Sequence, residues 1–422
     1  MKRIVTAIIL ILSFIPVLAQ KKEINAAIDN LKANKNLEKV ETSMMTLLKD
    51  SSNISNEKIW NLLFESLNKQ YQAGNEKLYL KQKYDTASLF NIASRMFAVM
   101  TRYDSIDAEP DKKGRVRPKM RKTNSSTLNS LRPNLFNGGI FFIGKYDYSK
   151  AYTLLDQYVS AAEMPIFKSY NYTAKDKNLP KAAYWAAYCG YKLNDAQKVL
   201  HNTYLALKDK EHYESMLQYL AATYMLENDT ARSIATMEEG FAKYPKSEYF
   251  FSHLMDYYSQ KANWDKATTL TDKAIKADSA NNMAWIAKST ILINSGDYEN
   301  SFRISQSVLQ KDSTIEDAWL NAGLAKNNQG VSLEHDTNDF KQKRKQVLHY
   351  YKEALPYLEK YRSLCPDNAD KWAMPLYSIY LNLNMGKQFE EIDELIKKRK
   401  WSLKLVPSYQ FTLKQMHLLM IG

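Results

Sequence analysis

Glycine and proline are scarce in this chain, with 12 and 11 residues in a sequence of 422. Both residue types interrupt helices and build turns, so their scarcity argues against an all-β or loop-rich protein and favours helices. Cysteine is rarer still, because only Cys189 and Cys365 occur. Secreted folds that depend on disulfides carry more cysteines than this, so two buried free thiols are expected.

Long apolar runs are also missing beyond the start of the chain. Lys2 and Arg3 precede an apolar stretch, and the small residue Ala19 follows it just before Gln20. This layout is typical of a secretory signal peptide over 1–19. After its cleavage no membrane span is expected, since no other stretch approaches the roughly 18 apolar residues that a span needs. We therefore expect a secreted protein, located in the periplasm.

The most informative pattern that is present is a repeat, in which similar residues recur at one constant spacing along the chain. Three columns of residues follow it without gaps, starting at Ala183, Ala187 and Gly190. The first column holds Ala183, Leu217, Phe251, Trp285 and Trp319; the second Ala187, Ala221, Met255, Ser289 and Gly323; the third Gly190, Tyr224, Tyr258, Leu292 and Lys326. Offsets of four and three place all three columns on one face of a helix. Trp285 and Trp319 are expected to fill equivalent core grooves between helices.

A turn and a second helix complete each repeat. The turn residues are Asn194-Asp195, Asn228-Asp229, Ala262-Asn263 and Gly296-Asp297, which break or cap helices. The second helix carries two further columns, namely Val199, Ser233, Ala267 and Ser301, then Ala206, Gly240, Ala274 and Val308. Most of these side chains are small, so two antiparallel helices can approach closely while bulky neighbours fill the adjacent groove.

This pattern resembles the tetratricopeptide repeat family, whose period of about 34 residues equals the spacing within each column. Pro245 and Pro366 stand where the family has its closing proline. The resemblance implies an all-α fold, a right-handed α-solenoid of antiparallel helix pairs, that binds protein or peptide partners and needs no cofactor. It is clear over about 132–400 and weaker over 23–108. The family's clamp of Lys and Asn for a C-terminal carboxylate is not reproduced here.

The repeat divides the chain into five parts. These are a signal peptide at 1–19, a helical region of degenerate repeats at 20–108, a basic linker at 109–131, a repeat array at 132–400, and a C-terminal capping segment at 401–422. The array contains two insertions, at 164–179 and 331–346. The apolar 401–422 segment is expected either to pack back on the array or to form a dimer contact.

The main candidate site is the concave face of the array. In the family that the chain resembles, the first helix of each pair lines this groove, which implies a set of partner-binding residues. They are Lys181, Tyr184, Tyr188, Gln218, Tyr249, Ser252, Asp256, Ile286, Thr290 and Leu320. The set is aromatic and mixed polar, as suits an extended peptide or protein segment.

A second candidate site is the basic stretch in the linker. Its cations are Lys112, Lys113, Arg115, Arg117, Lys119, Arg121 and Lys122. The stretch is predicted to be an exposed, solvated linker or, as the alternative, a site for an acidic component of the cell envelope. Nucleic acid is not an expected partner, because the protein is secreted and no aromatic side chains lie between the charges.

Motifs for catalysis or metal binding were not found. None of the six histidines has a zinc-protease spacing, and neither a phosphate-binding loop nor a nucleophile elbow occurs. The expected function is therefore a non-enzymatic scaffold that binds a protein or peptide. Two alternatives stay open: an envelope-associated assembly factor that contacts anionic surfaces, and a glycan-binding or hydrolytic protein on a helical-repeat scaffold.

Overall fold

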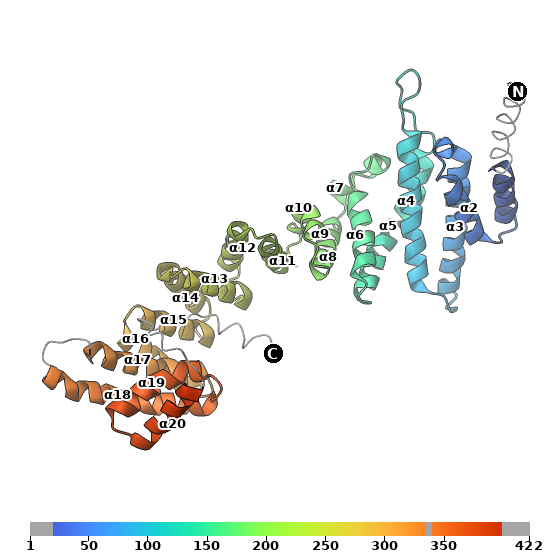
Figure 1. Cartoon of the computed structure of the whole chain (residues 1–422). Helices are drawn as coiled ribbons and strands as arrows, with labels where there is room; N and C mark the ends of the chain where they lie inside the picture. Colours follow the sequence, from blue (N-terminus) through green and yellow to red (C-terminus); the bar gives the residue numbers. More distant parts are fainter. Residues whose placement is uncertain (1–19, 335–339, 399–422) are drawn as a thin grey trace, which may run out of the picture. The chain divides into compact units, whose positions relative to one another are not determined.

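The structure, a computed structural model, describes residues 20–334 and 340–398 (Figure 1). Every regular element in these two ranges is a helix, and neither range contains a strand. Consecutive helices pack against one another as hairpins, which confirms the predicted all-α solenoid. Within the same ranges, no helix is both long and apolar enough to cross a membrane. The predicted signal peptide, 1–19, and the predicted capping segment, 401–422, lie outside the described residues.

The chain divides into an N-terminal unit, 1–233, and a C-terminal unit, 234–422. The N-terminal unit contains a helix over 20–32 and then α2 (Leu37–Leu47), η1 (Ser51–Asn53), α3 (Glu57–Tyr79), α4 (Thr86–Asp107), α5 (Arg121–Ile143), α6 (Tyr148–Ser160), η2 (Pro165–Tyr170), α7 (Tyr172–Lys175), α8 (Leu179–Lys192), α9 (Ala196–His201), α10 (Thr203–Ala206) and α11 (Tyr213–Leu226). The boundary falls inside α12 (Thr230–Lys243). The C-terminal unit continues with α13 (Glu248–Gln260), α14 (Trp264–Ala277), α15 (Asn282–Asn294), α16 (Tyr298–Lys311), α17 (Glu316–Glu334), α18 (Phe340–Leu364), α19 (Ala369–Asn382) and α20 (Gly386–Lys398).

The turns between paired helices repeat with the same period in their backbone geometry as in their sequence. Asn194, Asn228, Ala262 and Gly296 all have positive φ angles, between 50° and 84°. The next residue is in each case Asp or Asn, and its side chain accepts a hydrogen bond from the backbone N–H three residues later; these caps are Asp195, Asp229, Asn263 and Asp297. A left-handed residue followed by an N-cap ends one helix and starts the next within two residues.

The predicted small-residue columns are buried. The second column of the first helix and both columns of the second helix lie in the core at every described position. Gly190 shows why the side chains in these columns must be small. A Cβ atom at this residue would lie 2.7 Å from the backbone nitrogen of Val199 on α9. Close approach of paired helices therefore depends on these residues, as the sequence predicts.

The insertion at 164–179 forms η2 and α7 and is fixed to the repeats by a buried arginine. Arg132 of α5 is only 5% exposed, and its guanidinium lies between two aromatic rings, 3.7 Å from the centroid of Tyr158 and 3.9 Å from that of Tyr172. Its Nη1 donates to Asp176 at 2.6 Å, and its Nη2 donates to the carbonyl of Tyr158 at 3.0 Å. Paired and hydrogen-bonded in this way, a buried cation can hold an irregular segment in place.

The predicted boundary of the basic linker is wrong at its C-terminal side. The linker was expected over 109–131, but α5 begins at Arg121 and only 108–120 connects it to α4. Arg121 explains the difference, because its guanidinium binds the buried carboxylate of Asp104 through two hydrogen bonds of 2.8 and 2.9 Å. Met120 adds a backbone N–H bond to Asp107, at 3.0 Å. The loop projects beyond the ends of α4 and α5 (Figure 1).

The prediction that Trp285 and Trp319 fill core grooves is confirmed only in part. Both side chains are partly buried at the edge of the core, and each indole N–H bonds to the carbonyl six residues earlier, Ser279 or Ser313. Trp372 in α19 is buried more deeply, at 2% exposure. In α15 and α17 the ring therefore anchors the preceding turn and packs against the edge of the core.

The insertion at 331–346 lengthens a helix pair in its described part. α17 continues to Glu334 and α18 begins at Phe340, so the extra residues extend both helices. Glu334 accepts a hydrogen bond from Tyr351 at 2.9 Å and lies 3.4 Å from Arg344, which in turn bonds Asn382 of α19 at 2.7 Å. These contacts join three helices near the end of the pair.

Candidate functional site

One surface of the N-terminal unit gathers six aromatic side chains from α8, α11 and the turn before α11. We call it the aromatic face, and it consists of Tyr184, Trp185, Tyr188, Tyr191, His212 and Tyr219. All except Tyr184 are half-buried, so each keeps part of its ring accessible. The α8 members at 184, 188 and 191 follow offsets of four and three, which is why the helix presents them on one side. The result is a continuous, partly open aromatic patch.

Ring contacts hold the aromatic face in a fixed arrangement. Tyr184 stacks on His212 with centroids 4.2 Å apart, and Tyr191 stacks on Tyr219 at 4.6 Å. Trp185 and Tyr188 meet edge to face at 5.5 Å. Stacked and edge-to-face pairs at such distances stabilise each other beyond simple burial, so the patch is pre-ordered.

Two tyrosines of the aromatic face, Tyr188 and Tyr219, have raised pKa values and remain neutral. Burial, with a hydrogen bond to Tyr148, raises the pKa of Tyr188 to about 12. Burial also raises the pKa of Tyr219, with a further contribution from a hydrogen bond to Tyr184. Their hydroxyl groups can therefore both donate and accept hydrogen bonds at neutral pH, which suits recognition of peptide groups.

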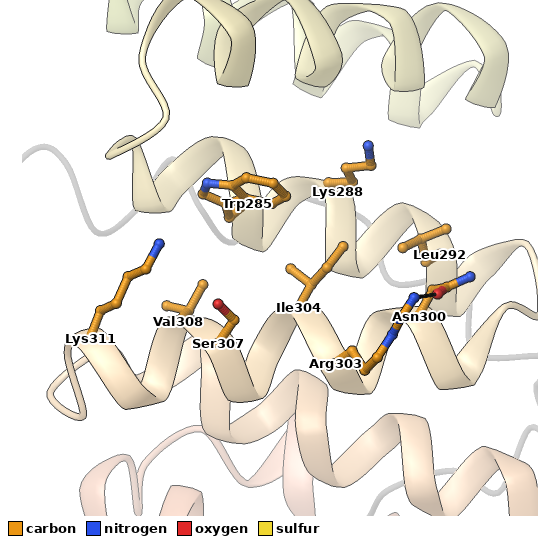
Figure 2. Close-up of a pocket in the computed structure, with 9 residues that line it drawn as sticks. All are labelled: Trp285, Lys288, Leu292, Asn300, Arg303, Ile304, Ser307, Val308 and Lys311. Carbon is orange, nitrogen blue, oxygen red and sulfur yellow. Dashed lines mark hydrogen bonds between the residues drawn. The ribbon is translucent and has the colours of Figure 1, made fainter.

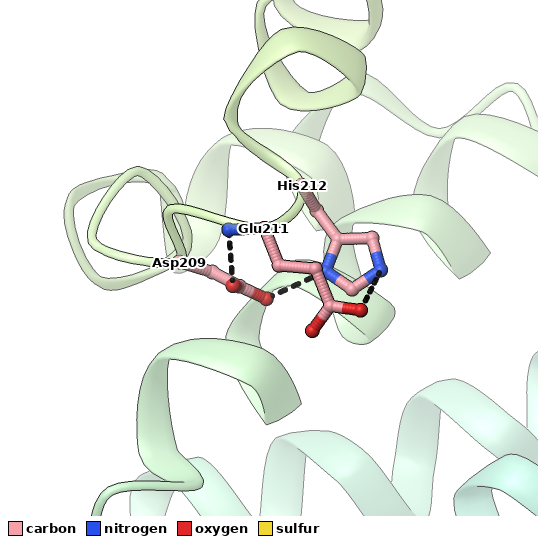
Figure 3. Close-up of side chains that lie close together, drawn as sticks. All are labelled: Asp209, Glu211 and His212. Atoms are coloured by element: carbon pink, nitrogen blue, oxygen red, sulfur yellow. Dashed lines mark hydrogen bonds and ion pairs between the residues drawn. The ribbon is translucent and has the colours of Figure 1, made fainter.

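An acidic corner adjoins the aromatic face in the turn before α11 (Figure 3). Asp209 accepts the backbone N–H of Glu211 at 3.1 Å, and its second oxygen lies 2.8 Å from Nδ1 of His212. Ligand atoms of these three side chains all lie within 4.8 Å of one another. The hydrogen bonds of Asp209 explain this closeness as turn geometry that orients the imidazole, so the cluster needs no metal ion.

Four of the predicted concave residues belong to the N-terminal unit, and the structure brings them to this region. Tyr184 and Tyr188 are part of the aromatic face, although Tyr184 is buried at 4% exposure. Lys181 joins the acidic corner through an ion pair with Glu211, at 3.0 Å. Gln218 of α11 is half-buried.

The other six predicted residues lie in the C-terminal unit and do not form one open surface. Ile286, Thr290 and Leu320 are buried, and Asn321 of α17 donates to Thr290 Oγ1 at 3.0 Å, so they join helices. These three residues and Tyr184 are therefore not free for a partner in the described chain. The remaining three, Tyr249, Ser252 and Asp256, are half-buried on α13. Partner binding by the accessible residues stays a prediction.

The basic loop is exposed over 109–117, as predicted for a solvated linker. Two of its seven predicted cations have partners: Arg121 binds Asp104, and Arg115 lies 2.7 Å from Asp111. The hydrogen bond from Arg115 is the main reason why the pKa of Asp111 is lowered. Among the described residues, the other five have no ion-pair partner; they are Lys112, Lys113, Arg117, Lys119 and Lys122.

Sequence reasoning missed four members of the aromatic face, namely Trp185, Tyr191, His212 and Tyr219. The concave assignment followed a few repeat positions and did not include the one that Trp185 and Tyr219 share, one period apart on α8 and α11. The available signal was the aromatic spacing within α8 itself. Residue spacing could not predict that His212 joins this group, because the irregular turn after α10 is what stacks it on the ring of Tyr184.

Neither a protein-family model nor a curated protein matches the chain. Among solved structures, it is similar to the C-terminal part of a TPR repeat-containing protein from Cytophaga hutchinsonii, with 15% identity and a TM-score of 0.43 over 64% of this chain and 97% of the other. It is also similar to the TPR domain of P58(IPK), with 13% identity and a TM-score of 0.26 over 90% and 99% of the two chains. A third similarity is to yeast Tom70, with 14% identity and a TM-score of 0.34 over 90% and 85%.

Proposed function

We propose that this chain is a non-enzymatic periplasmic scaffold that binds a protein or peptide partner on the aromatic face. The observation that carries the proposal is the group of half-exposed, pre-ordered aromatic side chains on α8 and α11. Tyrosine and tryptophan dominate binding energy in protein interfaces, because they offer large contact areas and lose little conformational freedom. The flanking Lys181 and Glu211 would supply the polar rim.

The chemistry of the thiols supports a binding role over a covalent catalytic one. Both cysteines are free and buried, as predicted. Burial raises the pKa of Cys189 to about 12, and burial together with a hydrogen bond to Glu316 raises that of Cys365 to about 12. Thiols that stay protonated at neutral pH are poor nucleophiles.

The proposal is tested by site-specific photocrosslinking in intact cells. A photoreactive amino acid replaces Tyr188, or, as the control, Tyr204 of α10, which is 76% exposed and lies outside the aromatic face. We expect the same protein adduct to form repeatedly at position 188 and not at position 204. Equal labelling at both positions, or no adduct at 188, would count against the proposal. Release of the protein by osmotic shock tests the periplasmic location separately.

A second candidate role is contact with an anionic envelope surface through the basic loop. The observation that favours it is the exposure of the loop together with four of its cations, Lys112, Lys113, Arg117 and Lys119, which lack ion-pair partners among the described residues. Each such cation near an anionic bilayer contributes about 1 kcal/mol of binding. Replacing Lys112, Lys113 and Arg117 by Gln should therefore abolish salt-sensitive retention on phosphatidylglycerol vesicles. Retention that persists in this variant would show that the loop does not make the contact.

A further inference from the structure

A cleft between α15 and α16 of the C-terminal unit has an unusual charge. It encloses about 490 Å³ (Figure 2). Its lining consists of Trp285, Lys288, Leu292, Asn300, Arg303, Ile304, Ser307, Val308 and Lys311. Three of these side chains are cations and none is an anion, so the formal charge of the lining is 3 − 0 = +3.

The preceding repeat provides an internal reference for this cleft. An equivalent cleft of about 390 Å³ lies along α13 and α14. It is lined by Leu254, Tyr258, Thr269 and Leu270, each one repeat period before Lys288, Leu292, Arg303 and Ile304 in turn. Its charged lining residues are Lys266, Lys273, Glu238 and Asp265, so the formal charge is 2 − 2 = 0.

The two clefts also differ in how their cations are compensated. In the reference cleft, Lys266 bonds the carboxylate of Glu238 at 2.9 Å. In the α15–α16 cleft only Lys288 has a carboxylate partner, Asp272, at 2.5 Å. Arg303 donates to the neutral amide of Asn300, and neither Arg303 nor Lys311 has an ion-pair partner among the described residues. Two positive charges in the cleft are therefore available to an anion.

The spacing of these two cations indicates the shape of the anion. Arg303 and Lys311 are eight residues apart on α16, which corresponds to about 12 Å along the helix axis. Figure 2 shows them at opposite ends of the cleft. An extended peptide covers that distance in about four residues. Two carboxylates separated by three or four residues would therefore reach both cations.

The floor between the cations is apolar. Trp285 is half-exposed and held by its N–H bond to the carbonyl of Ser279, and Ile304 and Val308 lie beside it in Figure 2. A ring fixed in this way offers contact area without loss of side-chain freedom. The middle residue between two carboxylates four positions apart faces the same side of an extended chain and would thus be apolar.

We propose that the α15–α16 cleft binds an acidic peptide segment of another protein, with two carboxylates that flank an apolar residue. The segment 399–422 of this chain does not suit it, because that segment carries Arg399, Lys400, Lys404 and Lys414 and no acidic side chain. A concave site with an apolar floor also suits a peptide better than the surface of a bilayer. The site is separate from the aromatic face, so a test of one does not decide the other.

The test uses the full chain and a short fluorescein-labelled peptide with Glu at positions 1 and 5, Leu at position 3 and Ser at positions 2 and 4, because alternate side chains of an extended chain share one face. Binding is followed by fluorescence anisotropy. The double variant Arg303→Gln/Lys311→Gln should bind at least about tenfold more weakly, since each lost charge-assisted bond is worth roughly that factor. Arg303→Lys should retain most of the binding. The matched double variant Lys266→Gln/Lys273→Gln removes the same charge from the reference cleft and should change the affinity by less than about twofold.

Three results would overturn the proposal. One is equal binding of a peptide with Gln in place of Glu. Another is an equal loss of binding in both double variants, which would indicate diffuse attraction to a basic protein. The last is weak peptide binding combined with binding of phosphatidylglycerol vesicles that depends on Arg303 and Lys311, which would assign the cleft to lipid. Unchanged thermal unfolding of the variants checks that they fold. Tyr188→Ala should bind the labelled peptide with unchanged affinity, which separates this site from the aromatic face.

Discussion

The regular repeats of α13 to α16 and the interrupted region around Arg132 hold their helices together by different means. From α13 to α16 the helices repeat with a strict period, and the buried polar groups of these four helices are small hydroxyls such as Ser289, Ser301 and Ser305. In the N-terminal unit the period is interrupted by a loop and an insertion, and the cation of Arg132 is buried instead. The difference indicates that regular stacking needs only small residues, whereas an irregular segment needs a specific polar anchor.

The largest expected effect is at Trp372 in the C-terminal unit. Its ring is 2% exposed, its N–H donates to the carbonyl of Cys365 at 3.1 Å, and the guanidinium of Arg362 lies 5.0 Å from it. Trp372→Ala should destabilise the unit by about 3–5 kcal/mol, as for large aromatic residues in cores. Trp285→Ala, at a half-exposed repeat position, should cost about 1–2 kcal/mol. Urea unfolding measures both, and the reverse order would contradict the burial seen here.

A nearly equal effect is expected at Arg132 in the N-terminal unit. Arg132→Met leaves the carboxylate of Asp176 without its cation, which should cost about 3–5 kcal/mol. Hydrogen exchange should then increase in α5 to α8 while α15 to α20 stay protected. Arg95→Met is the matched control, because Arg95 is 42% exposed in its pair with Glu41, and such pairs contribute about 0–1 kcal/mol. Equal exchange in the two variants would show that Arg132 is not an anchor.

A smaller effect is expected within the hydroxyl group of the C-terminal unit. Ser289 Oγ lies 2.9 Å from Ser301 Oγ and 2.7 Å from Ser305 Oγ, all buried. Ser289→Ala leaves its partners with fewer hydrogen bonds and should cost about 1–3 kcal/mol. Replacing all three by Ala should recover most of that loss, because no polar group is left unsatisfied. A triple variant that is much less stable than the single one would indicate that the hydroxyls are needed together.

The smallest effect on stability is expected in the basic loop. Trypsin should cut the native protein first within 112–117, where the chain is exposed, and not at Arg121, which Asp104 holds in α5. The nicked protein should keep its thermal unfolding temperature, since few contacts of the helices involve the loop. Mass spectrometry of the early fragments gives the cleavage site. A first cut elsewhere, with the loop intact, would show that the loop is protected by acidic groups.

Much of the repeat architecture was predictable because it is local. The turn columns at 194–195 and 228–229 specify a helix end and a helix start through φ preference and capping, and the structure shows both. The small residues at Ala187 and Ala221 are buried as predicted. Such signals depend on neighbours within a few residues, so the sequence carries them directly.

The candidate site was only partly predictable, because it depends on exposure. Repeat position suggested Tyr184 and Ile286 equally with Tyr188, but burial removes the first two from the surface. The charge of the α15–α16 cleft likewise appears only when α15 and α16 are placed together. Spacing predicts which residues share a helix face, but not which faces the neighbouring helices cover.

By itself, the sequence determined the all-α class, the repeat period, the turn geometry and the two free thiols. The tertiary structure alone decided that Arg121 belongs to a helix through Asp104, that Arg132 is enclosed by Tyr158 and Tyr172, and that the indole of Trp285 lies over a turn. The physical reason is separation along the chain. Helix and turn preferences act within one turn of backbone, whereas desolvation and ion pairing join residues 17 to 44 positions apart.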